Sequence, residues 1–184
     1  MPTSTTTELE AALPHLRAAP RETGTLDMVV RRPERLAREL LDEALIDEAA
    51  GLVGDNWLSR ATSHAIAEGR HLEAMITVMS SRMIGVLSDD PEVQVLAGDQ
   101  LYVDLDLSHD NLPAGTRIAV GDEVVLEVSA KPHAGCKKFL ARFGPEDVAF
   151  VNGEVGAPMR LRGLNARVVH SGVVRPGDVV RRLG

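Results

Sequence analysis

The chain has 184 residues, of which 44% are hydrophobic and 3% aromatic, and its formal net charge is −7. No apolar run reaches the ~18 residues that a membrane span needs. An acidic chain that is poor in aromatic residues also lacks the basic surface and the stacking platforms of a nucleic-acid-binding protein. We therefore expect a soluble protein that binds neither membranes nor nucleic acids.

The first 24 residues are polar and Thr-rich, with a short helical pattern at Leu9, Leu13 and Leu16. They predict a leader or surface helix outside the core, and residues 25–184 then form a single domain. The start of the chain lacks the basic residues and the apolar centre of a signal peptide, so we expect a cytoplasmic location.

The next part of the chain alternates between β-like and glycine-punctuated segments. Residues 33–51 open with a proline, close on a glycine and space their apolar residues as a helix does, although strand character competes there. Residues 82–87 either continue the strand before them or turn helical. The predicted order is a strand at 26–32, a helix at 33–51, a loop at 51–71 and a strand at 75–80.

The C-terminal half consists of short β-rich runs, separated by turn sequences at intervals of ~8 to 15 residues, the spacing of a compact β-barrel. One insertion, residues 132–162, holds a predicted helix and the only cysteine. The fold class predicted is mainly β, a single-domain barrel with flanking helices. The runs are LYVDLDLS, GTRIAVGDEVVLEVSA, NARVVHSGVV and GDVVRRL.

Cys136 is the best candidate for chemistry. It stands at the start of the predicted helix and is followed by Lys137 and Lys138. Unpaired backbone N–H groups, the helix dipole and the lysines all favour the thiolate, which is the nucleophilic and metal-binding form. The alternative is that a lone cysteine is a small buried hydrophobic residue.

His133 lies three residues before the cysteine. It could orient a ligand, transfer a proton at neutral pH or pair with the thiolate, or it could only cap the turn. A structural zinc site is not expected, because no second ligand pair with suitable spacing follows. Asp99, in the sequence AGDQL, is predicted to serve a turn.

Six blocks in order resemble the MOSC domain, the C-terminal module of molybdenum-cofactor sulfurases that also occurs as a standalone bacterial protein. The resemblance spans roughly Leu26 to Leu183. The blocks are GDQLYVDLDL, LPAGTRIAVGDEVVLEV, HAGCKKFLARFG, FVNGE, LRGLNARVV and SGVVRPGDVV.

The resemblance implies a β-barrel in which Cys136 carries sulfur as a persulfide or ligates the molybdenum of the pterin cofactor. One branch of the family uses the metal to reduce N-hydroxylated compounds. Soft thiolate sulfur suits both roles. The pterin also bears a phosphate, for which the expected cradle is Arg142, Arg160, Arg162 and Arg167.

Two hypotheses from different classes follow. The first is a molybdenum-cofactor protein acting in sulfur transfer or in reduction of N-oxygenated compounds, with Cys136 and His133 at its catalytic site. The chain has no room for a pyridoxal-phosphate desulfurase region and no flavin or iron–sulfur motif, so this function needs a separate sulfur donor or electron-transfer protein. The second is a non-catalytic barrel that binds a small anion or a protein partner and keeps Cys136 as a structural residue.

Overall fold

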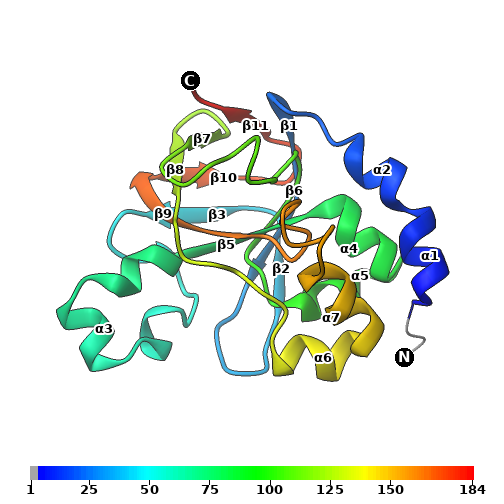
Figure 1. Ribbon diagram of the computed structural model, residues 1–184. Coiled ribbons are helices and arrows are strands. Elements are labelled where there is room, and N and C mark those ends of the chain that lie inside the picture. Colours follow the sequence, from blue (N-terminus) through cyan, green and yellow to red (C-terminus); the bar gives the residue numbers. More distant parts are fainter. Residues whose placement is uncertain (1–3) are drawn as a thin grey trace.

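Seven β-strands close into a barrel (Figure 1) in this computed structural model, which describes residues 4–184. The sheet closes because β11 pairs with both β7 and β1. In spatial order the barrel strands are β11 (Val179–Arg182), β7 (Arg117–Val120), β8 (Val124–Val128), β9 (Leu164–His170), β5 (Ile76–Ser80), β6 (Leu101–Asp104) and β1 (Thr23–Arg31).

The odd number of strands imposes one parallel pair. A closed ring can alternate up and down all the way round only if its strand number is even. Here β5 and β6 are parallel, and every other neighbouring pair in the ring is antiparallel. Parallel strands need a crossover connection. The crossover is residues 81–100, which hold α4 (Ser81–Leu87), α5 (Pro91–Gln94) and a 3₁₀ helix, η3 (Val95–Ala97).

The barrel interior is filled by alternate side chains of its strands. In β8, for example, Val124, Leu126 and Val128 are buried and the two residues between them are half-buried. Such alternation with period two places one face of a strand on the core. The β-rich runs that were predicted in the C-terminal half are all confirmed as strands.

A layer of helices covers one side of the barrel (Figure 1). All five residues of β5 are buried, because Ile76 and Val78 face the barrel core while Met79 faces a second apolar cluster beneath the helices. The remaining helices of this layer are α1 (Thr6–Ala11), α2 (Leu13–Arg17), α6 (Lys137–Phe143) and α7 (Pro145–Asn152).

The N-terminal segment is part of that layer. Leu9 and Leu16 are buried in the second cluster, so the expectation that this segment stays outside the core is corrected. The predicted boundary after residue 24 falls within β1.

The helix predicted at residues 33–51 is wrong. The segment forms β2 (Glu39–Leu41), which extends the sheet beyond β1, and β3 (Ala44–Asp47) and β4 (Gly51–Leu52), which make a small sheet with β10 (Gly172–Val174). In β3 the burial alternates, with Ala44 and Ile46 buried and Leu45 exposed. Pairing with β10, more than 120 residues away in the sequence, outweighs the local helical preference.

Residues 51–71 were predicted as a loop, but more than half of them belong to β4 or to short helices. The open alternative at residues 82–87 is decided in favour of a helix, which Ser80 caps by accepting a hydrogen bond from the Met83 N–H at 3.3 Å. The short helices of residues 51–71 are η1 (Leu58–Arg60), α3 (Ser63–Ala67) and η2 (Arg70–Ala74), the last of which continues beyond residue 71. Within residues 4–184 no helix is long and apolar enough to cross a membrane.

Gly163 allows β9 to approach β5 closely. Its φ is +105°, and a Cβ atom added there would lie 2.1 Å from the backbone oxygen of Val78. Gly115 has a similar φ of +89° but open space where a Cβ would stand. The two glycines therefore separate backbone strain from steric overlap.

We predict that Gly163→Ala lowers the free energy of unfolding by more than ~3 kcal/mol, because positive-φ strain of about 1–2 kcal/mol adds to a collision with rigid backbone. Gly115→Ala, the matched control, loses only the strain. Urea unfolding followed by circular dichroism measures both. Equal losses for the two variants would contradict the close approach of β9 and β5.

Candidate functional site

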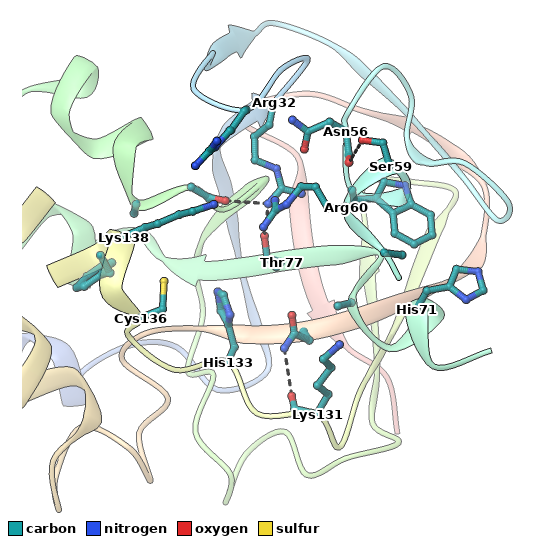
Figure 2. A pocket seen from close by; sticks show the side chains of 18 of the residues that line it. Arg32, Asn56, Ser59, Arg60, His71, Thr77, Lys131, His133, Cys136 and Lys138 are labelled. Atoms are coloured by element: carbon teal, nitrogen blue, oxygen red, sulfur yellow. Dashed lines mark hydrogen bonds between the residues drawn. The ribbon is translucent and has the colours of Figure 1, made fainter. Parts of the chain in front are cut away.

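A cavity of about 950 Å³ opens beside the barrel. Its walls come from segments that are distant in the sequence. They are the loop between β1 and β2, the segment around η1, α3 and η2, Thr77 of β5, the end of the crossover before β6, Arg162 and Asn165 at the start of β9, and the loop that leads into α6 with α6 itself. Figure 2 shows Cys136 and His133 on the loop that leads into α6, with Arg60 and Thr77 across from them. The barrel topology thus gathers polar side chains from the whole chain at one place.

Cys136 is the N-cap residue of α6 and is exposed. This confirms the predicted helix start. Partial burial raises the pKa of its thiol, but the backbone N–H groups of Phe139 and Lys138 and the charge of Arg162 outweigh that effect and lower the pKa below its usual value. The thiol at the edge of the cavity therefore ionises more readily than a free cysteine.

Three side chains hold the loop that precedes Cys136. Asn165 on β9 donates to the carbonyl oxygens of Lys131 (3.2 Å) and Pro132 (3.1 Å). Asn152, the last residue of α7, accepts from the Gly135 N–H at 2.8 Å and donates to the Gly135 carbonyl at 3.1 Å. Asp99 binds His133. Cys136 is thereby preorganised although it lies on a loop.

Asp99 is a fully buried charge beside the cavity. Its two carboxylate oxygens accept from Arg162 Nη1 at 2.6 Å and contact His133 Nε2 at 2.7 Å, and its side chain is 0% exposed. Burial alone would raise the pKa of Asp99, but Arg162 and His133 outweigh it and the pKa falls to about 2. For His133, burial and the charges of Arg162 and Arg32 lower the pKa although Asp99 opposes them. His133 is therefore neutral at physiological pH.

Besides the exposed Arg35, three guanidinium groups of the cavity have no carboxylate partner among residues 4–184. We call these three the cationic wall: Arg38, Arg60 and Arg142. A Cβ atom on Gly98 would lie 3.3 Å from Arg38 Nη2 and 3.5 Å from Arg142 Nη1, so these two groups converge. Burial and then the neighbouring charges of Arg142 and Arg32 lower the pKa of Arg38. Within the described chain the Nε atom of Arg38 is buried with no hydrogen-bond partner.

The arrangement of the cationic wall favours an anion. Like charges that are partly desolvated repel one another, and the repulsion is relieved by a bound negative group. The three lysines of the chain all lie within residues 131–138, and Lys131 and Lys138 add to the same cavity. The net charge of −7 thus conceals one strongly positive pocket.

Arg32 belongs to the cavity lining but is already neutralised. It forms a two-point ion pair with Asp55, with Nε to Oδ2 and Nη2 to Oδ1 both at 2.8 Å, and both side chains are buried. Its remaining Nη1 donates to the Gly98 carbonyl at 2.9 Å. Arg32 therefore connects Asp55 with the Gly98 backbone at the cavity wall.

Four of the six predicted site residues meet at the cavity, namely Cys136, His133, Arg142 and Arg162. Arg162 is committed to Asp99 and to the Ala97 carbonyl (3.0 Å), and it stacks on Phe139 at 4.8 Å.

The other two predicted arginines lie elsewhere, so the expected phosphate cradle is corrected. Arg160 is buried and donates to the carbonyls of Leu107 and Leu112. Arg167 falls on the exposed face of β9, where its Nη2 pairs with Glu127 at 2.7 Å. Neither lines the cavity.

Sequence reasoning missed Arg38, Arg60 and the role of Asp99. Arg38 lay in the segment that was interpreted as a helix, and Asp99 was interpreted as a turn residue. The order Gly98, Asp99, Gln100 offered the one available signal, since two polar residues directly precede an apolar strand. Gln100 is buried and accepts from the Thr77 N–H at 2.8 Å, which joins β6 to β5.

Among residues 4–184 no group of three or more His, Cys, Asp or Glu side chains is arranged to hold a metal ion. Together the fold and the site define a β-barrel protein with a positively charged cavity beside an ionisable cysteine.

Comparison with known proteins identifies the family. The family model described as the MOSC domain matches residues 90–181, half of the chain, so the protein belongs to the MOSC domain family. No curated protein matches the sequence significantly.

Solved structures agree on the fold. YuaD from Bacillus subtilis is similar with a TM-score of 0.59 and 19% identity, over 86% of this chain and 94% of that one. YiiM from Geobacillus stearothermophilus has a TM-score of 0.58 and 14% identity, over 88% and 75% of the two chains. YiiM from Escherichia coli has a TM-score of 0.54 and 18% identity, over 87% and 70%.

We predict that Cys136 is alkylated rapidly near neutral pH, because its pKa is lowered and its thiol is exposed. The rate of iodoacetamide labelling, followed by mass spectrometry from pH 5 to 10, should reach half its maximum at a lower pH than for a free cysteine. The chain has one cysteine, so the label reports on a single site. Slow labelling that accelerates only on unfolding would contradict an accessible thiolate.

Proposed function

We propose that the protein binds a molybdenum cofactor in the cationic pocket, with the Cys136 sulfur as a ligand of the metal or as a carrier of sulfur. One observation carries the proposal: an exposed thiol with a lowered pKa lines the same cavity as the cationic wall, whose guanidinium groups lack carboxylate partners in the described chain. Soft thiolate sulfur is a suitable ligand for a sulfur-rich metal centre. Membership of the MOSC family supports the same class of ligand.

The residues present fit the phosphate-bearing pterin. The buried, unpartnered Nε of Arg38 and the convergence of Arg38 with Arg142 are features of an anion site rather than of a solvated surface. Guanidinium groups bind phosphate oxygens through paired, charge-assisted hydrogen bonds. A cavity of about 950 Å³ also exceeds the needs of a single phosphate.

When bound, the molybdenum centre supplies two-electron redox chemistry or a site for sulfur. The chain's own residues would bind and orient the cofactor. Arg38 and Arg142 would hold the phosphate, and Cys136 would present its sulfur from the start of α6. Asn152 and Asn165 keep the Cys136 loop in place, and His133 stands beside the thiol as a neutral imidazole.

The alternative of a non-catalytic barrel with a structural Cys136 receives less support. A packing cysteine would be buried, whereas Cys136 is exposed and faces the cavity. In either version of the favoured function, sulfur transfer or reduction of N-oxygenated compounds, we propose that a separate protein supplies the sulfur or the electrons.

We predict that Cys136→Ser removes the bound molybdenum, or the cyanide-releasable sulfur, because a hydroxyl ionises too weakly to replace the thiolate. The melting temperature should stay equal or rise slightly, since serine is a good N-cap residue at this exposed position. Metal analysis and cyanolysis of protein from cells that make the cofactor measure the loss. Wild-type protein that carries neither molybdenum nor releasable sulfur would refute the proposed function.

We predict that Arg38→Met weakens inorganic phosphate binding to the metal-free protein by about 1.5–3 kcal/mol, because one charge-assisted contact is lost. Relief of the repulsion from Arg142 and Arg32 should leave the melting temperature unchanged or higher. Protection of Cys136 from alkylation by phosphate measures the affinity.

Arg167→Met is the matched control, since this arginine lies outside the cavity. If phosphate affinity falls equally in both variants, phosphate binding depends on the overall charge of the protein and not on Arg38. A large fall in the stability of Arg38→Met would assign Arg38 a structural role.

A further inference from the structure

Three side chains form a hydrogen-bonded row at the wall of the cavity. Arg162 Nη1 donates to one carboxylate oxygen of Asp99 at 2.6 Å, and the other oxygen contacts His133 Nε2 at 2.7 Å. The Asp99 side chain is 0% exposed, that of Arg162 6% and that of His133 17%. Arg162 and His133 both line the cavity, and the carboxylate that joins them is fully buried.

The chemistry of the row decides which nitrogen of His133 carries hydrogen. An ionised carboxylate can only accept, so the Nε2 atom of His133 must donate to Asp99. In a neutral imidazole the other nitrogen, Nδ1, then has a free lone pair.

Nδ1 remains open to the cavity. In the described chain it has no hydrogen-bond partner, and it is not among the buried polar atoms that lack one. Figure 2 shows the His133 ring reaching into the pocket beside Cys136.

We propose that Asp99 is a positioning residue, which holds His133 as the neutral Nε2–H tautomer and thereby makes Nδ1 the proton-transfer atom of the pocket. The use of that proton rests on the proposed function, whereas the tautomer does not. The charged groups that face His133 from the packed elements are Asp99, Arg162 and Arg32.

The proton has a defined task in the reductive version of the function. Two-electron reduction of an N-hydroxylated compound breaks the N–O bond and takes up two protons, because the oxygen leaves as water. An electron-transfer protein supplies the electrons. Nδ1 of His133 takes a proton from solvent and passes it to the leaving oxygen, and the Asp99 carboxylate stabilises the imidazolium in between.

Asp99→Asn tests the proposal because Arg162 can only donate. The amide introduced there must turn its oxygen to Arg162 and its NH₂ group to His133. Nε2 must then accept, and the hydrogen moves to Nδ1. A change of one atom thus reverses the tautomer at nearly constant shape.

The tautomer is measured by long-range ¹H–¹⁵N NMR on the metal-free protein at pH 7.5, with His133→Gln to assign the signal among six histidines. We expect a protonated Nε2 in the wild type and a protonated Nδ1 in Asp99→Asn. Asp55→Asn, which breaks the other buried Asp–Arg pair, is the matched control. The melting temperature should fall in both variants, but in Asp55→Asn the His133 side chain should keep the wild-type tautomer. A protonated Nδ1 in the wild type overturns the proposal even if Asp99→Asn fails to fold.

Reduction by the molybdenum-loaded protein tests the proton role. Asp99→Asn should keep its metal and lose about 100-fold or more in rate, the usual contribution of a general acid or base. An unchanged rate with a reversed tautomer overturns the proton role. The expected tautomer in a wild type that binds no molybdenum supports the positioning by Asp99 and refutes the proposed function instead.

Discussion

Closure of a ring of seven strands is the constraint on which the site depends. An odd ring needs one parallel pair, β5 and β6, and a parallel pair needs a crossover. The crossover places helices on one side of the barrel, and its last three residues are Gly98, Asp99 and Gln100. It therefore delivers a carboxylate to the place where the loop before α6 brings His133 and Cys136.

The electrostatics of the cavity divide into two parts. In one part every charge is matched: Asp55 neutralises Arg32, and Asp99 serves Arg162 and His133. These buried pairs are costly to break, since each removal leaves a desolvated charge without a partner. In the other part Arg38 and Arg142 converge, and neither forms an ion pair with a carboxylate of the described chain. The matched part makes the scaffold rigid, and the unmatched part is where an anion would gain most.

The pKa of the Cys136 thiol depends on one local and one distant contribution. The thiol faces the N–H groups of α6 and lies within reach of the Arg162 charge, so its ionisation depends on both local and distant residues. The local contribution was visible in the sequence, because a cysteine before a helical pattern and two lysines is enough to predict it. The contribution of Arg162 was not, since that residue arrives from the far side of the insertion.

The sequence by itself determined the β-rich half and the helix at Cys136, because alternation of apolar residues and helix-start signals are local properties. The family followed separately, from six sequence blocks that resemble the MOSC domain, and the family model over residues 90–181 confirms it. Only the tertiary structure decided that residues 33–51 form strands, since their partner β10 lies at the other end of the chain. It also decided which arginines reach the cavity. Arg38 and Arg60 face it while Arg160 and Arg167 do not, and the difference arises from strand pairing and loop packing that no single segment encodes.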